Sequence, residues 1–155
     1  MIARELMQTA APTLSPQDNI TRAAELLTDY AHSNIAVVDA DNRLLGMVGE
    51  EDILALALPT SVAELGSLSY LPRCYGLRNL SDEELRDVRV EQIMRTEDFV
   101  TIEEDELAAQ AALLITRNHQ PQIFVTSGGK YIGRLCRKHI ISELVNPTLG
   151  IACHP

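Results

Sequence analysis

The sequence has no apolar run near the ~20 residues that a membrane-spanning helix needs. Its N-terminus, MIARELMQTAAP, lacks the basic start and the long apolar stretch of a secretory signal. From these two absences we expect a cytoplasmic protein without a membrane partner.

Cysteine is also scarce. The chain has three cysteines, Cys74, Cys136 and Cys153, and they are scattered along it. Their odd number and their spacing match neither a disulfide framework nor a metal-binding motif. This pattern favours a reducing compartment and predicts no metal site.

Basic residues are outnumbered, since 13 Lys and Arg face 22 Asp and Glu and the formal net charge is −9. Such a balance argues against a general nucleic-acid-binding surface, because phosphate backbones attract basic proteins. It still permits a small anionic ligand at a local basic patch. With 155 residues and 46% hydrophobic content, the chain is long enough for one core, or for two small subdomains that share one.

The clearest structural pattern lies between Asn34 and Ala57. Apolar and β-branched residues predict a buried strand over 35–38 and a second strand over 43–48, joined by a turn of Asp and Asn residues. A helix is expected from Gly49 onward, because the three acids that follow it favour the positive end of a helix dipole.

Before this unit we expect a short helix over 2–7 and an extended segment over the proline-bounded stretch 12–16. Asp18 or Asn19 can cap a further helix over 20–30, whose apolar residues share one face.

The stretch 59–89 has no strong single period, and we interpret it as a long connection with helical pieces. One piece is expected after Ser81, which opens a capping-box sequence. Connections of this length often cover a site or a partner surface. A solvated linker packed by Tyr70, Leu71 and Leu77 is an equal alternative.

After the connection, the order of the first half returns. The predicted elements are a helix at 90–94, an extended segment at 99–102, a helix capped by Asp105 and ending near Arg117, strands at 122–126 and 131–135, and a helix at 137–145. A constant shift of 87 residues relates the two halves. It pairs Met7 with Met94, Thr9 with Thr96, Asp18 with Asp105, Ala24 with Ala111, Leu27 with Leu114, Gly46 with Gly133 and Ile53 with Ile140. The chain is therefore an internal duplication.

The residues of this pattern include Met7, the segment 12–16, Ala24, the strand 35–39, and the sequence from Gly46 to Leu54 that ends in Asp-Ile-Leu. Through them each half resembles a cystathionine-β-synthase (CBS) domain, and the pair resembles a Bateman module. The resemblance implies an α/β (α+β) fold of two β-α-β-β-α repeats packed in pseudo-two-fold symmetry. It divides the chain into CBS repeat 1 (1–58), a linker (59–89), CBS repeat 2 (90–146) and a tail (147–155).

The resemblance also implies a function. Modules of this family commonly bind AMP, ADP, ATP or S-adenosylmethionine, form dimers through their helices and carry no catalytic chemistry of their own. We therefore expect a non-enzymatic regulatory sensor that binds an adenine nucleotide or other adenosyl ligand in the cleft between the repeats, forms a homodimer and signals to an effector protein. The alternative is a degenerate CBS pair without nucleotide binding, a structural or protein-interaction module that uses 59–89 as its recognition surface.

The resemblance places the family's ribose-binding aspartate at Asp52, whose two carboxylate oxygens match a vicinal diol. The alternative is an acid that only stabilises the start of a helix. Three positions earlier, where the family has a phosphate-binding Ser or Thr, this chain has Gly49. A glycine N–H at a helix start can bind an anion, but Glu50 and Glu51 beside it repel one.

In the second repeat, Cys136 and His139 stand at these two positions. A neutral His139 accepts one hydrogen bond and matches a diol less well than a carboxylate. Together with Arg134, Arg137 and Lys138 it forms a basic cluster that is the best candidate for an anion site. The alternative is a solvated basic face.

The adenine slot that the resemblance implies consists of backbone and apolar side chains, for which a core role is the alternative. The slot residues are Thr13, Leu14, Ile35, Ala36 and Val37 in the first repeat, and Thr101, Ile102, Gln122, Ile123 and Phe124 in the second. His32 and His119 are weaker ligand candidates near helix ends. No acid–base partner in the sequence supports catalysis by Cys136.

Overall fold

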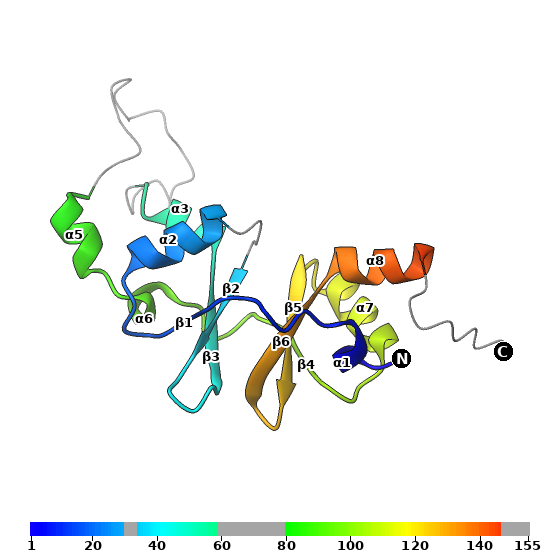
Figure 1. Ribbon diagram of the computed structural model, residues 1–155. Coiled ribbons are helices and arrows are strands. Elements are labelled where there is room, and N and C mark those ends of the chain that lie inside the picture. Colours follow the sequence, from blue (N-terminus) through cyan, green and yellow to red (C-terminus); the bar gives the residue numbers. More distant parts are fainter. Residues whose placement is uncertain (30–33, 59–79, 147–155) are drawn as a thin grey trace, which may run out of the picture. The chain divides into compact units, whose positions relative to one another are not determined.

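A computed structural model describes residues 1–29, 34–58 and 80–146 (Figure 1). Helices and strands alternate in the order that the duplication predicts. The elements are α1 (Ala3–Leu6), β1 (Thr13–Leu14), α2 (Ile20–Asp29), β2 (Asn34–Val38), β3 (Leu44–Gly49), α3 (Glu50–Ala55), α5 (Asp82–Asp87), α6 (Val90–Ile93), β4 (Thr101–Glu103), α7 (Ala108–Arg117), β5 (Gln122–Ser127), β6 (Lys130–Cys136) and α8 (Arg137–Val145).

The first sheet has the strand order β1-β2-β3, with β1 parallel to the central β2. Figure 1 shows α2 and α3 on one side of this sheet. The apolar face of α2 packs on it, because Ala23 and Leu27 belong to one core with Ile35 and Val37 of the central strand. A covered central strand explains why β2 is almost continuously apolar.

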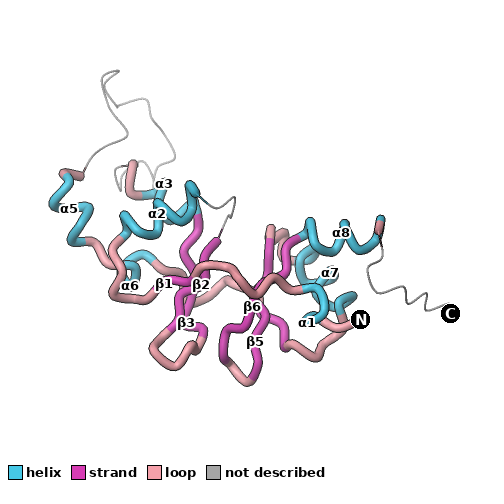
Figure 2. The backbone as a smooth tube through the Cα atoms, in the orientation of Figure 1, coloured by secondary structure: helices cyan, strands magenta, loops and turns pink. Residues whose placement is uncertain are grey.

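The second sheet repeats this arrangement with the order β4-β5-β6. Strands β4 and β5 are parallel, and β5 and β6 form an antiparallel hairpin that Figure 2 traces. The hairpin turns at Gly128 and Gly129, whose φ values of 58° and 82° favour glycine. The core below this sheet consists of Ala3, Ile102, Ala111, Ile115, Ile123, Val125 and Leu135.

The described chain forms two compact units that differ from the two sequence repeats. One unit contains Met1–Ala11, Ala40–Leu44 and the described residues from Asp98 onward, and the other contains Pro12–Asp39 and Leu45–Glu97. Each unit thus takes in the N-terminal segment of the other repeat. Burial explains the exchange, since Ala3 of α1 is fully buried in the second sheet's core and Val90 of α6 in the first sheet's core.

Two glycines fix these exchanged segments against the strands. A Cβ on Gly46 would collide with the main-chain oxygen of Arg95, and a Cβ on Gly133 would lie 2.8 Å from the main-chain oxygen of Gln8. Both positions are related by the repeat, so each unit needs a glycine where the exchanged segment crosses its last strand.

The predicted strands and helices are confirmed to within a few residues, and α8 spans the predicted 137–145. Asp105 is not a cap, because α7 starts at Ala108 with Leu107 as its N-cap. The cap of α2 is Asn19, whose Oδ1 accepts from the Arg22 N–H at 3.0 Å. Some of our predictions concern residues outside the described part of the chain. These residues are Tyr70, Leu71, Leu77, Cys74, Cys153 and His32. None of the described helices is long and apolar enough to span a bilayer.

Candidate functional site

Asp52 lies in the first turn of α3, directly after the last strand of the first sheet. Its side chain is 14% exposed. Its Oδ2 atom accepts a hydrogen bond from the Gly49 N–H at 2.7 Å, so the carboxylate caps its own helix. This contact also occupies the Gly49 N–H, which was a possible anion donor in the sequence beside the repelling Glu50 and Glu51.

Arg95 contacts the same carboxylate. Its Nε atom lies 3.2 Å from Asp52 Oδ2, with 32% of the arginine side chain exposed. Two main-chain hydrogen bonds to Met47, of 2.8 and 2.9 Å, hold the Arg95 backbone beside β3. Arg95 was not identified from the sequence. Its one signal is the constant shift of 87 residues, which pairs Met7 with Met94, the residue just before Arg95.

Strand alternation separates the five slot residues of the first repeat into two sets. Leu14, Ile35 and Val37 are at most 2% exposed and belong to the core beneath α2. Thr13 and Ala36 are register partners on the opposite face. Only these two therefore share the sheet face that turns away from this core.

The corresponding position in the second unit is filled by its own side chains. Arg134 is 3% exposed. Its guanidinium donates to Gln122 Oε1 at 3.1 Å and to Gln8 Oε1 at 2.7 and 3.2 Å. Ile102 and Ile123 are core residues, whereas Phe124 stacks edge-on against Phe99 and Tyr131. Thr101, the register partner of Phe124, is exposed.

His139 takes the place of Asp52 at the start of α8. Its Nδ1 atom accepts from the Cys136 N–H at 3.4 Å, which parallels the Asp52–Gly49 contact. Burial lowers the pKa of His139, and the positive charge of Arg134 lowers it further. Burial likewise raises the pKa of the Cys136 thiol, which favours an unreactive protonated sulfur.

The basic residues of the second repeat do not form one exposed patch. Arg134 is buried. Arg137 donates to the main-chain oxygens of His119 and Gln120 at 3.1 and 3.0 Å, and so holds the chain that follows α7. Lys138 is exposed. Burial therefore removes Arg134 from the predicted exposed cluster, whereas Arg137 and Lys138 are both exposed.

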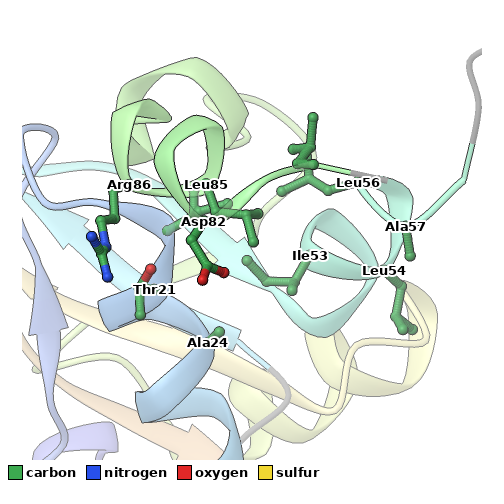
Figure 3. Close-up of a pocket in the computed structure, with 11 residues that line it drawn as sticks. Thr21, Ala24, Ile53, Leu54, Leu56, Ala57, Asp82, Leu85 and Arg86 are labelled. Atoms are coloured by element: carbon green, nitrogen blue, oxygen red, sulfur yellow. The ribbon is translucent and has the colours of Figure 1, made fainter. Parts of the chain in front are cut away.

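An apolar groove of about 630 Å³ lies in the unit of the first sheet, between α2, α3 and α5 (Figure 3). Leu85 and Ile53 point toward each other across it, and Asp82 and Arg86 lie at its edge. None of the binding residues that we predicted lines this groove. The predicted site and the groove thus have no lining residue in common.

The family model of the CBS domain matches residues 3–58 and 90–146. The chain belongs to the CBS domain family. As a CBS pair it is of a kind that generally acts in regulation rather than catalysis. No curated protein matches the chain.

Solved structures of CBS proteins share this fold. A CBS domain-containing protein of unknown function from Bacillus anthracis has 23% sequence identity and a TM-score of 0.71, over 95% of this chain and 94% of that one. CBSX2 in complex with AMP has 21% identity and a TM-score of 0.69, over 93% and 96%. The CBS domain of a bacterial CNNM/CorC family Mg²⁺ transporter, in complex with ATP, has 15% identity and a TM-score of 0.66, over 94% and 87%.

Within the described residues, no group of three or more His, Cys, Asp or Glu side chains is arranged to hold a metal ion. The chemistry of the Asp52 region is instead that of hydrogen bonding. A carboxylate accepts from vicinal hydroxyls, and a guanidinium donates to anions.

Proposed function

We propose that this CBS pair is a non-enzymatic regulatory module that binds an adenine nucleotide at Asp52. The observation that supports the proposal most directly is the set of hydrogen bonds made by the Asp52 carboxylate. Its Oδ2 atom is held by Gly49 and Arg95, and among the described residues no protein group donates to Oδ1. The open Oδ1 atom has two lone-pair sites, so it can accept from both hydroxyls of a ribose diol. The AMP and ATP complexes of similar structures support this ligand class.

The ligand acts as a regulatory ligand rather than as a cofactor. Thr13, which is partly exposed, and the buried Ala36 form the adenine slot on the sheet face away from the core, and Leu14, Ile35 and Val37 support it from the core. Because Arg134 and two glutamines fill the equivalent place in the second unit, we propose one nucleotide per chain. For the second repeat, Thr101, Ile102, Ile123, Arg137, Lys138 and His139 stay predictions as contacts of a second ligand, which the proposal of one nucleotide at Asp52 does not require.

The ligand signals by shifting the population of the chain's conformations. A nucleotide that binds one arrangement of the chain more tightly stabilises it, and an effector protein then recognises that arrangement. A cytoplasmic homodimer is the proposed form. Exposed apolar side chains support association through helices, since Leu54 of α3 is 64% exposed and Leu144 of α8 is 78% exposed.

Thermal-shift measurements with AMP, ADP, ATP and S-adenosylmethionine test the proposal. A ligand at 100 times its Kd should stabilise the protein by about 2.7 kcal/mol. Asp52→Asn should remove this shift, and His139→Gln, at the matched position of the second repeat, should preserve it. A flat result for all four ligands with the folded protein would contradict nucleotide binding.

The second candidate is a protein-interaction module without nucleotide binding. The apolar groove favours it, because Leu56, Leu80 and Leu85 offer an apolar surface that Asp52 does not line. Under this alternative, Leu85→Asp should abolish capture of the effector protein while Asp52→Asn preserves it. The opposite pattern would support the nucleotide proposal.

A further inference from the structure

We propose that Arg95 makes the Asp52 site selective for phosphorylated adenine nucleotides over uncharged or cationic adenosyl compounds. This inference rests on the proposed function, and it narrows the ligand class. Neither the family pattern nor the sequence motif around Asp52 contains this residue, because Arg95 reaches the site from the segment after α6.

The charges around Asp52 make a cation necessary for a phosphate ligand. Glu50, Glu51 and Asp52 are consecutive acids at the start of α3, and the usual phosphate-binding hydroxyl is replaced by Gly49. The Gly49 N–H is already bonded to Asp52. A phosphate in this place would meet repulsion unless a fixed positive charge lay beside the carboxylate, and Arg95 supplies that charge.

The Arg95 guanidinium retains donors for a ligand. Its Nε atom is bonded to Asp52, and its two terminal nitrogens have no protein partner among the described residues. The side chain is 32% exposed. A planar guanidinium with two open N–H groups is suited to bidentate contact with phosphate oxygens.

The backbone fixes Arg95 in this place before any ligand arrives. Main-chain hydrogen bonds join Arg95 and Met47 in both directions, and Gly46 has no side chain to push the segment away. Asp52 in turn orients the guanidinium through Nε. A preorganised donor loses little conformational entropy on binding.

The arrangement predicts different affinities for adenosyl compounds of different charge. AMP offers a diol to Asp52 and a phosphate to Arg95. Adenosine offers the diol alone, and S-adenosylmethionine brings a sulfonium cation toward the guanidinium. Among the described residues of the second unit, the position matching Arg95 holds the uncharged Gln8, and the buried Arg134 is bonded to Gln8 and Gln122.

Titration calorimetry with AMP and adenosine tests the inference on the full chain. For the wild type, AMP should bind at least about tenfold more tightly than adenosine, since a hydrogen bond to a charged group contributes of this order. Arg95→Met should weaken AMP binding by about 10- to 100-fold and leave adenosine within about twofold. Arg95→Lys should recover part of the loss.

Arg22→Met is the matched control, because it removes the same charge from an exposed position of α2 in the same unit. It should leave both affinities unchanged. Equal affinities of the wild type for AMP and adenosine would overturn the selectivity while leaving the proposed function intact, and this comparison needs no variant. Equal weakening of both ligands by Arg95→Met would overturn it too. If the folded wild type bound neither compound, the proposed function would fail with it.

Discussion

Arg95 and Asp52 lie 43 residues apart in the chain, and the Nε of one donates to the Oδ2 of the other at 3.2 Å. This ion pair joins the N-terminal segment of the second repeat to the last helix of the first. It depends on the exchange of segments between repeats, which brings Arg95 beside Met47. The candidate ligand site thus belongs to a compact unit, not to a single sequence repeat.

Removal of the Asp52 carboxylate should cost stability as well as binding. Asp52→Ala deprives the Gly49 N–H of its acceptor and Arg95 of its counter-charge. We expect the free energy of unfolding to fall by about 1–2 kcal/mol, as for other lost helix caps. Asp52→Asn, which retains an acceptor oxygen, should cost less than half as much. Urea unfolding followed by circular dichroism measures both, and equal losses would contradict the capping role.

The two repeat glycines should be intolerant of a methyl group. Gly46→Ala and Gly133→Ala force new atoms against main-chain oxygens, and we expect each to destabilise the protein by about 1–3 kcal/mol. Gly46→Ala should also weaken nucleotide binding, because the collision displaces Arg95. Gly128→Ala is the control, since no atom lies within 4 Å of its added Cβ. It should lower stability through its φ of +58° without changing the affinity.

The buried guanidinium of the second unit should depend on its amide partners. Gln8→Ala removes an oxygen that accepts two hydrogen bonds from Arg134. The expected loss of stability is about 1.5–3 kcal/mol, because a buried charged donor loses one of its acceptors. Gln110→Ala makes the same chemical change at an exposed position of α7 and should stay within about 0.5 kcal/mol. Similar losses in the two variants would show that Arg134 does not need Gln8.

His139 should make stability depend on pH. Its pKa is lowered in the folded state by burial and then by Arg134, so the unfolded chain binds its proton more tightly than the folded chain does. The stability contributed by neutral His139 is complete above the unfolded pKa of about 6.5 and is lost as the pH falls through that value toward the folded pKa.

Urea unfolding between about pH 5 and 7.5 measures this effect. His139→Gln retains an acceptor for the Cys136 N–H and should show a shallower loss of stability at low pH than the wild type. Parallel pH profiles of the two proteins would contradict the assignment.

Local sequence patterns predicted most of the fold. Apolar runs identified β2 and β5, and the shift between Gly46 and Gly133 identified the duplication, because both depend on neighbouring residues or on a constant spacing. The exchange of α1 and α6 between units was not predictable in this way. The exchange depends on which hydrophobic core buries Ala3 and which buries Val90. A sequence repeat does not contain that information.

The candidate site at Asp52 was predicted only in part, because local sequence patterns do not show contacts between distant segments. Asp52 follows from the motif on its own helix. Arg95 comes from a distant segment, so only the repeat register pointed to it. The basic cluster of the second repeat was predicted because its residues are close in sequence. In the structure the Arg134 side chain is buried, whereas the Arg137 side chain contacts the main chain just after α7.

The central claim is that Asp52 holds an adenine nucleotide, and titration calorimetry of AMP into the full chain tests it most directly. We predict one AMP per chain, a Kd at least about tenfold higher for Asp52→Asn, and an unchanged Kd for His139→Gln. Absence of binding to the folded wild type, or equal affinity of Asp52→Asn and wild type, would contradict the claim.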